Sequence, residues 1–343
     1  MDLYDELPEP PRGPGEKASE SSPSESTPTH VNAAGKRRAE TIDTGSCDGR
    51  HREKKVCKGL ISLKAHVAER RGEREELQDA HTICDLSQDC QPMPADISRL
   101  SYYAVFDGHG GTRASRFAAH NLHQNLVKKL PKGEGSSVEK AMKRCILDAF
   151  KQTDEEFLKQ AASQKPAWKD GTTAICVLVA DNILYIANLG DSRALLCRIN
   201  EETHKPTVLS LSREHNPTQY EERMRIQRAG GNVRDGRVLG LLEVSRSIGD
   251  GQFKRCGVIS TPDVKRCPLT HSDRFILLAC DGLFKVFSPE EATNFILNIV
   301  QEEGSQEDDL DTRYESACHR LASEAVRRGS ADNVTVLLVQ IQL

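Results

Sequence analysis

Features that would place a protein outside the cell or in a membrane are missing from this sequence. The first residues contain no apolar run of the kind that a signal peptide needs, so we expect no secretory leader. No stretch reaches the ~18 consecutive apolar residues of a membrane-spanning helix, so we expect no membrane partner. The 11 cysteines are odd in number and include no C-x-x-C pair, which fits a reducing compartment rather than a disulfide framework. Together these absences predict a cytoplasmic protein.

Aromatic residues are scarce in the first third of the chain, where Tyr4 is the only one before Tyr102. Six of the 15 prolines lie within the first 28 residues. Such a segment has too little apolar content to offset the entropy lost on ordering. We therefore predict a disordered tail over residues 1–58 and one domain over residues 59–343, whose ~285 residues approach the upper limit for a single core.

A strong positive charge is also missing. The formal net charge is −4 and the pI is about 6.3, whereas a dedicated nucleic-acid binder is usually strongly basic. We therefore expect no nucleic-acid partner. Two short basic clusters, GKRR and REKK, lie at the edge of the tail. We interpret them as solvated linker charge, with a nuclear address as the alternative, so the nucleus is a second expected location.

Apolar residues in the body of the chain recur with the spacing of amphipathic helices. Four helices are predicted, over residues 113–130, 136–162, 288–300 and 313–329. The second is expected to begin with a capping box of Ser136 and Glu139. The third is expected to begin with Ser288 as N-cap and Pro289 at the first helical position, and the fourth to end at Gly329.

Strands are predicted by the apolar runs LKAHVAER, SYYAVF, RFILLAC and VTVLLVQIQL, and three more in succession are predicted over residues 173–199. Within that last segment we expect a hairpin turn at Asp181 and the next turn at Gly190. Consecutive strands joined by tight turns cannot form a doubly wound parallel sheet. The pattern therefore predicts an α+β protein in which helix pairs cover antiparallel sheets.

Aspartates lie at the ends of several predicted strands. Asp107 and Asp281 each end an apolar run, Asp332 precedes another, and Asp79 lies in a polar segment after a further strand. Any one of them is explained as a turn former or cap. Taken together they favour a shared rim, where clustered carboxylates would repel one another unless cations lay between them. Hard oxygen ligands indicate Mg²⁺ or Mn²⁺ rather than zinc.

Seven stretches occur in a characteristic order: REELQDAH, VFDGHGG, DGTTAICVLV, NLGDSRALL, EVSRSIGD, ACDGLF and SADNVTV. This ordered set resembles the metal-dependent serine/threonine protein phosphatases of type 2C, and the resemblance extends from about Val67 to the end of the chain. It implies a four-layer α-β-β-α sandwich of two packed antiparallel sheets flanked by helix pairs. It also implies hydrolysis of phosphoserine and phosphothreonine in phosphoprotein substrates, with two ions, Mg²⁺ or Mn²⁺, per subunit.

The resemblance also assigns roles to residues of this chain. For the metal ions it implies Asp107 as the bridging carboxylate, Gly108 as a carbonyl ligand, Asp281 and Asp332 as ligands of the second ion, and Asp79 as a ligand acting through water. It implies His109 as general acid towards the serine leaving group and Arg74 as the residue that binds substrate phosphate. For His109 the alternative is a hydrogen-bonded surface residue, and for Arg74 an ion pair with a neighbouring glutamate. Two bound ions would acidify a water that attacks phosphorus directly, so that no covalent phosphoenzyme forms.

Other phosphatase chemistries lack their residues here. None of the 11 cysteines is followed by arginine six positions later, so a cysteine nucleophile of the C-x5-R type is excluded. The Gly-Asn-His-Glu run of another binuclear class is also absent. Two alternatives stay open: a catalytically weak regulatory protein that binds a kinase or phosphoprotein, and a hydrolase of small phosphate esters.

Two positions depart from the family pattern. Gln78 stands where many members carry glutamate, and Lys285 stands where members commonly carry the aspartate that, with the residue matching Asp191, binds a weaker third ion. Because an ammonium group repels cations, we predict that the third site is absent or very weak. The alternatives are that Lys285 faces solvent without effect and that Asp191 only shapes its turn.

The segment at about 213–240 corresponds to a variable flap beside the active site in this family. It contains glycine hinges and many Arg and Glu residues, so we expect a mobile substrate-recognition element, with a solvated surface helix as the alternative. Four further stretches, QKPAWKDG, NPTQYEERMRIQ, GGNVRDGRVLG and GLFKVF, resemble a branch of the family associated with integrin-linked kinase. This likeness implies that kinase as a partner, and we expect the chain to be a monomer.

Overall fold

The computed structural model describes residues 61–87, 97–130, 138–302 and 309–342. The predicted tail over residues 1–58 lies outside these residues, as does the predicted capping box at Ser136. Side chains are described from residue 141 onward in the second helix. The boundaries predicted for the tail and the domain therefore stay predictions.

Helices and strands alternate in groups along the described chain. The helices are α1 Arg113–Lys129, α2 Val138–Ala162, α3 Tyr220–Arg228, α4 Gly251–Lys254, α5 Asp281–Phe284, α6 Pro289–Gln301 and α7 Leu310–Arg327. The strands are β1 Ser62–Arg70, β2 Ala80–Asp85, β3 Leu100–Phe106, β4 Gly108–His109, β5 Gly171–Thr172, β6 Ala174–Ala180, β7 Ile183–Leu189, β8 Arg193–Ile199, β9 Pro206–Ser210, β10 Val233–Arg234, β11 Arg237–Val238, β12 Ile248–Gly249, β13 Asp263–Pro268, β14 Asp273–Ala279 and β15 Val334–Gln342.

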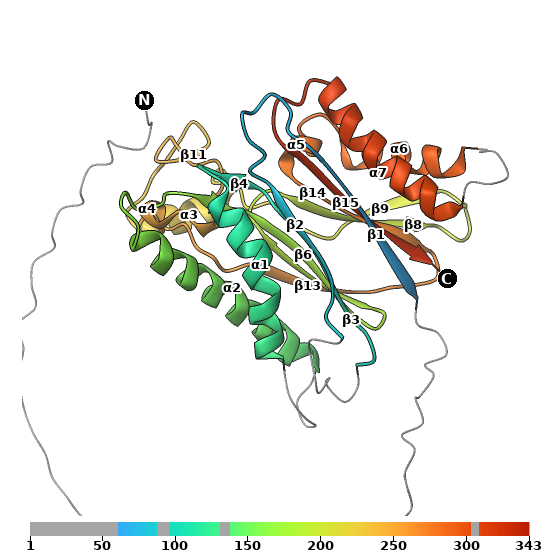
Figure 1. Cartoon of the computed structure of the whole chain (residues 1–343), viewed down its shortest axis with the longest axis horizontal. Coiled ribbons are helices and arrows are strands. Elements are labelled where there is room, and N and C mark those ends of the chain that lie inside the picture. The colour runs from blue at the N-terminus through green and yellow to red at the C-terminus, as the bar shows by residue number, and fades with distance from the viewer. Residues whose placement is uncertain (1–60, 88–96, 131–137, 303–308, 343) are drawn as a thin grey trace, which may run out of the picture. The chain divides into compact units, whose positions relative to one another are not determined.

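Two five-stranded antiparallel sheets form the centre of the fold (Figure 1). The first sheet has the order β1-β15-β14-β8-β9, and the second sheet has the order β13-β7-β6-β3-β2. β1 and β15 pair over their whole length, from Ser62 opposite Gln342 to Arg70 opposite Val334. The two strands that come first in the chain, β1 and β2, thus form edges of different sheets. A small third sheet of β12, β5 and β4 positions the loop after β3.

Three apolar clusters show how these elements form layers. One cluster joins the second sheet to α1 and α2, and includes Phe106, Leu122 and Phe150. Another joins the first sheet to α6 and α7, and the third lies between the two sheets. Successive side chains of a strand point to opposite faces, so strands such as β3 and β14, which are buried along almost their whole length, contribute to two clusters. The predicted four-layer α-β-β-α sandwich is confirmed.

The predicted turns have two different outcomes. β6 and β7 pair as a hairpin in which Ala180 lies opposite Ile183, and Asp181 has a positive φ of 53°, so the first turn is confirmed. The predicted second hairpin at Gly190 is wrong. β7 belongs to the second sheet and β8 to the first, so the chain crosses between sheets at Gly190 and carries Asp191 to the rim that both sheets share.

α6 begins and α7 ends as the sequence predicts, while α7 begins at Leu310, three residues before the predicted start. Ser288 accepts a hydrogen bond from the Glu291 backbone at 3.2 Å, and the Glu291 side chain accepts one from the Ser288 backbone at 2.8 Å. Pro289 is the first residue of α6. α7 is followed by Gly329 with a φ of 92°, the left-handed conformation that commonly ends helices. Within the described ranges, no helix combines the length and apolar character needed to cross a membrane.

Candidate active site

The site is built around the loop that leaves β3. The Asp107 carbonyl accepts a hydrogen bond from the Thr173 backbone at 2.9 Å, and the Asp107 backbone donates one to the Thr173 hydroxyl at 3.2 Å. Gly108 has no room for a side chain, since a Cβ there would lie 2.2 Å from the Gln78 carbonyl oxygen. Gly110 and Gly111 have φ values of 69° and 137°, which only glycine adopts readily. The loop therefore needs glycine at Gly108 for close packing and at Gly110 and Gly111 for the turn.

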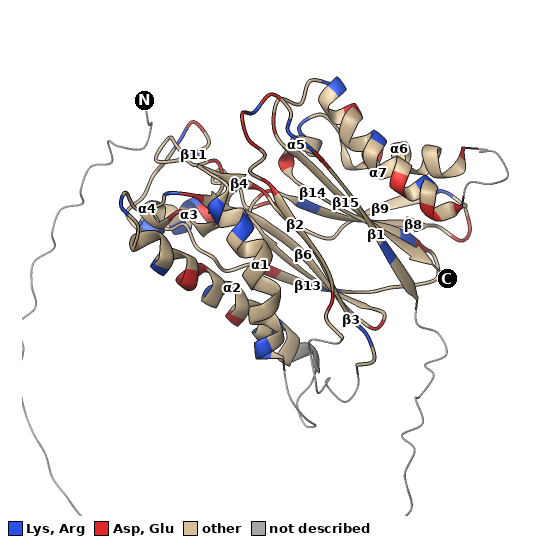
Figure 2. Ribbon diagram, in the orientation of Figure 1, with Lys and Arg blue, Asp and Glu red and all other residues tan. Residues whose placement is uncertain are grey.

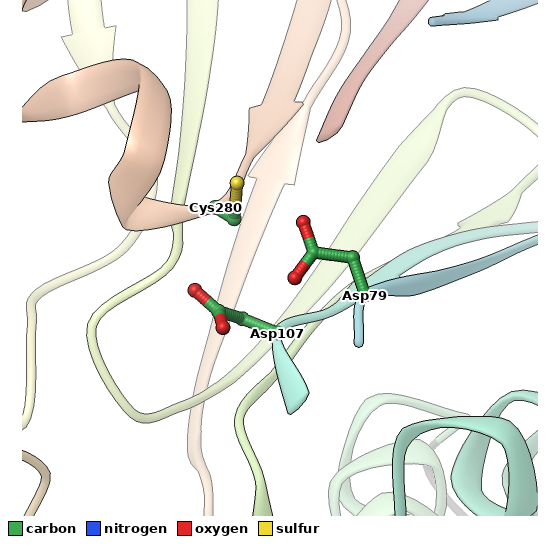
Figure 3. Close-up of side chains that lie close together, drawn as sticks. All are labelled: Asp79, Asp107 and Cys280. Atoms are coloured by element: carbon green, nitrogen blue, oxygen red, sulfur yellow. The ribbon is translucent and has the colours of Figure 1, made fainter. Parts of the chain in front are cut away.

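Four of the strand-end carboxylates meet at this loop. Ligand oxygens of Asp107, Asp191 and Asp281 all lie within 4.8 Å of one another, and so do those of Asp79 and Asp107 with the Cys280 sulfur. Figure 3 shows Asp79, Asp107 and Cys280 brought together from the start of β2, the end of β3 and the end of β14. Both sheets thus deliver their strand ends to one rim, and Asp191 belongs to this cluster as well as to its turn.

Burial and the charge of neighbouring carboxylates raise the pKa of three of these carboxyls, those of Asp79, Asp107 and Asp191. Burial and then the charges of Asp79 and Asp281 raise the pKa of Asp107 well above its usual range. Burial raises the pKa of Asp79 to about 7, although a hydrogen bond from Thr335 acts in the opposite direction. Burial, followed by the charge of Asp281, likewise raises the pKa of Asp191 to about 7. Divalent cations bound between such carboxyls would offset their repulsion and stabilise the ionised form.

The donor atoms fit a divalent cation such as Mg²⁺ or Mn²⁺. The Oδ1 atom of Asp79 is buried without a hydrogen-bond partner among the described residues, and buried polar atoms otherwise have partners. Its Oδ2 atom accepts a hydrogen bond from the Thr335 hydroxyl at 2.7 Å. Apart from Cys280, the clustered ligands are carboxylate oxygens, which hard cations prefer. The unpartnered Asp79 oxygen is thus available to a cation or to its bound water.

Asp332 completes the acidic rim, and two basic side chains contact it. The Lys285 ammonium lies 2.7 Å from Asp281 Oδ2 and 2.8 Å from Asp332 Oδ2. Arg74 Nη2 lies 3.0 Å from the other oxygen of Asp332. Lys285 thus does not merely face solvent, because it bridges two of the carboxylates predicted to bind the second ion. The Arg74 side chain is 60% exposed, so it can leave this ion pair and reach a phosphate.

His109 lies beside the cluster and is held by a buried carboxylate. Its Nε2 atom is 2.7 Å from Asp250 Oδ2, and Asp250 also accepts a hydrogen bond from the Ser247 hydroxyl at 2.6 Å. Burial lowers the pKa of His109, but the neighbouring charge of Asp250 outweighs it and the pKa is raised. The imidazole is therefore favoured in the protonated form that a general acid requires.

The segment at 213–240 contains α3 and the β10–β11 hairpin. α3 is fixed to the body through Glu222, which is 2% exposed. Its carboxylate accepts hydrogen bonds from Arg225 at 2.7 Å, Arg246 at 2.7 Å and the Ser245 hydroxyl at 2.5 Å. Burial raises the pKa of Glu222, and these hydrogen bonds outweigh it, so the pKa is lowered. The role of this segment in substrate recognition stays a prediction.

Two residues of the site, Asp250 and Cys280, escaped sequence reasoning. Asp250 lies in the stretch EVSRSIGD and Cys280 in the stretch ACDGLF, both of which carry the family resemblance. Membership of these stretches was the only feature of the sequence that pointed to either residue. Cys280 accepts a hydrogen bond from the Thr335 backbone at 3.1 Å and contacts the Asn333 carbonyl at 3.3 Å. It therefore ties the end of β14 to the start of β15 beside the cluster. The structure brings all seven predicted site residues to this region, while their individual roles stay predictions.

Comparisons with known proteins agree with this geometry. Residues 63–334, more than half of the chain, match the family model described as protein phosphatase 2C. The integrin-linked kinase-associated serine/threonine phosphatase 2C of Bos taurus is 61% identical over 370 residues, covering 100% of this chain and 100% of that protein. The Homo sapiens protein of the same description is 70% identical over 297 residues, covering 84% of this chain and 76% of that protein.

A solved structure shares the fold. The crystal structure of serine-threonine phosphatase 2C from Toxoplasma gondii superimposes with a TM-score of 0.66, at 22% sequence identity. The match covers 82% of this chain and 95% of that one. The sandwich is thus a fold that recurs in a solved structure.

Proposed function

Because the chain belongs to the protein phosphatase 2C family, we propose that it hydrolyses phosphoserine and phosphothreonine in proteins with two divalent cations, Mg²⁺ or Mn²⁺. Its family and the names of its relatives make it a protein-serine/threonine phosphatase, and the family is metal-dependent. The observation that carries the metal proposal is the meeting of Asp79, Asp107, Asp191 and Asp281 at one rim.

The carboxylates would hold the cations between the ends of the two sheets. Asp107 lies in both groups of clustered ligands, which supports it as the residue that would contact both ions. Asp281 and Asp332 share the Lys285 ammonium, which supports their assignment to one ion. When bound, the two cations would lower the pKa of a water enough to supply hydroxide at neutral pH.

The remaining steps belong to side chains of the protein. Arg74 would bind the phosphoryl oxygens, where a guanidinium can make two parallel hydrogen bonds. His109 would donate a proton to the serine or threonine oxygen as the phosphorus–oxygen bond breaks, a step that contributes about 10²–10⁴-fold. Asp250 holds the imidazole by Nε2, so the proton transferred to the leaving group would come from Nδ1.

The second candidate function is a catalytically weak protein that binds a kinase or phosphoprotein. The Lys285 ammonium favours it, because an ion pair with Asp281 and Asp332 competes with a cation for the same oxygens. Regulation of integrin-linked kinase signalling is supported by the names of the relatives alone. For either function, we also propose that the protein is a monomer located in the cytoplasm and the nucleus.

Phosphopeptide hydrolysis separates the two candidates. We expect the full chain to hydrolyse a phosphothreonine peptide in Mn²⁺ and to lose this activity in EDTA. Asp107→Ala should lower kcat by at least ~100-fold, because the lost carboxylate would hold both cations. Equal rates in the two proteins, unaffected by EDTA, would rule out the phosphatase mechanism and leave the binding protein.

A further inference from the structure

An open groove of about 490 Å³ lies outside the candidate active site, between β2 and α1. Four consecutive residues of β2, Ala80 to Ile83, line one side of it. Successive side chains of a strand point to opposite faces, so a groove that touches all four follows the edge of the strand rather than one face. The other side is lined by one face of α1, namely Arg116, Ala119, His120 and His123.

β2 is the last strand of the second sheet, where it pairs with β3. No other strand within the described ranges pairs with its outer side, so a row of backbone N–H and C=O groups faces the groove. Such an edge is the feature to which extended peptides add as a new strand. Ile83 is 41% exposed at this edge, which leaves an apolar contact for an incoming side chain.

The groove begins next to the candidate active site and leads away from it. Ala80, at its near end, directly follows Asp79 of the carboxylate cluster. Ser115 of α1 donates a hydrogen bond to the Gln78 carbonyl at 2.5 Å, and four residues later Thr82 donates one to the Ala119 carbonyl at 2.8 Å. α1 and β2 therefore run side by side in the same direction (Figure 1), and the six residues of β2 extend about 20 Å from the cluster.

Basic side chains line the helical side of the groove. Figure 2 shows basic positions in the part of α1 nearest the loop with β4. The Arg116 guanidinium is exposed and has no ion pair or hydrogen bond among the described residues. His120 and His123 follow on the same face, and His81 on the strand side is held by Glu69 at 2.7 Å. An acidic side chain in the groove would find Arg116 free to bind it.

We propose that this groove binds an extended acidic segment of the phosphoprotein substrate, adjacent to the phosphorylated residue, as an added strand on β2. The inference rests on the proposed function, because the phosphorylated residue must lie at the carboxylate cluster. It assigns substrate selection to the backbone edge of β2 and to Arg116, with alternate side chains of the segment facing α1 and Ile83.

Phosphothreonine peptides with different flanks test the proposal. One peptide has three residues, and the others carry a six-residue arm, acidic or neutral, before or after the phosphothreonine. With the full chain in Mn²⁺, we expect one acidic arm to raise kcat/KM about tenfold over its neutral counterpart. N-methylation of alternate arm residues should abolish this gain in one register and spare it in the other, because only alternate N–H groups of a strand face its neighbour.

Charge reversal on the groove provides the matched variants. Arg116→Glu should lower kcat/KM for the acidic-arm peptide at least fivefold and leave p-nitrophenyl phosphate hydrolysis unchanged. Arg144→Glu makes the same change on α2, where the side chain is 85% exposed, and should have no effect on either substrate. Three results would overturn the proposal: equal kcat/KM for acidic and neutral arms, the same effect of N-methylation in both registers, or equal effects of Arg116→Glu and Arg144→Glu.

Two further measurements separate this proposal from the proposed function. Binding of the fluorescein-labelled acidic-arm peptide, measured by anisotropy, should weaken at least fivefold in Arg116→Glu whether or not the protein turns over substrate. If the protein hydrolysed p-nitrophenyl phosphate but an acidic arm neither raised kcat/KM nor bound more weakly to Arg116→Glu, the proposed groove would be rejected and the proposed phosphatase function would stand. A peptide-free protein that light scattering shows to be dimeric would mean that β2 pairs with a second copy, and would overturn the proposal.

Discussion

Lys285 is a residue whose replacement should strengthen metal binding. Its ammonium lies 2.7 Å from Asp281 and 2.8 Å from Asp332, two carboxylates predicted to hold the second ion. A cation that binds these oxygens must displace both contacts. We therefore predict that Lys285→Met tightens Mn²⁺ binding, and that Lys285→Asp tightens it further and adds a bound ion.

The magnitude follows from the exposure of the ion pairs. The Lys285 side chain is 45% exposed, so solvent screens each contact, and about 1 kcal/mol per contact is the upper part of the range for such pairs. Two contacts give about 2 kcal/mol. At about 1.4 kcal/mol per tenfold change in Kd, Lys285→Met should tighten Mn²⁺ binding by about 30-fold. Lys285→Asp changes the local charge by two units and should exceed this value.

Isothermal titration calorimetry of the metal-free full chain with Mn²⁺ measures both the affinity and the number of ions. Lys64→Asp is the matched control, because Lys64 is also about half exposed and paired with an aspartate. It lies far from the carboxylates, about 20 Å along β1 from Arg70, which pairs with Val334 close to Asp332. This control should change neither quantity. If Lys285→Asp bound the same number of ions with the same Kd as the unmodified chain, the role assigned to its charge would be refuted.

Three other predictions concern the proton donor, the carboxylates and the flap. Asp250→Asn should lower kcat for phosphoserine peptides at least tenfold and for p-nitrophenyl phosphate less than about threefold, because nitrophenolate leaves without a proton; equal losses would contradict the positioning of His109 by Asp250. In EDTA, the free energy of unfolding measured in urea should fall as the pH rises from about 4 through 7, because the pKa of Asp79 is about 7 when folded and 3.8 otherwise. Between these pH values the folded Asp79 carboxyl keeps a proton that the unfolded one has lost, so the free energy of unfolding should fall by at most about 4 kcal/mol. A free energy of unfolding that did not change with pH would contradict this prediction. Glu222→Gln should lower the free energy of unfolding by about 2 kcal/mol, since it leaves the partly buried Arg225 without its charge partner and Arg246 with Asp263 alone. Glu221→Gln, whose side chain is 78% exposed, should not lower it; equal effects would mean that the buried carboxylate does not anchor α3.

Local patterns in the sequence predicted most of the helices and buried strands. The apolar runs before Asp107 and Asp281 are β3 and β14, and Ser288 caps α6 as expected. The spacing of apolar residues and the residues that cap a helix are local in the sequence, so both can be recognised from a single sequence. β2 was not predicted, because its six residues mix polar and apolar side chains as an edge strand does.

Contacts between distant residues explain what the sequence did not predict. The turn at Gly190 resembles a hairpin turn, but turn residues do not determine which sheet receives the next strand, and here the chain changes sheets. His109 and Asp250 are 141 residues apart, a separation at which spacing carries no information. The charge of Lys285 and its distance of four residues from Asp281 were visible, whereas its second contact, with Asp332, required the fold.

The central claim is that acidic residues from both sheets hold two divalent cations. Anomalous scattering from a crystal of the full chain grown in Mn²⁺ tests it most directly. We predict two peaks about 3.5–4 Å apart, with Asp107 contacting both and Asp281 and Asp332 contacting one of them. Density without an anomalous peak between Asp107 and Asp281 would contradict the account.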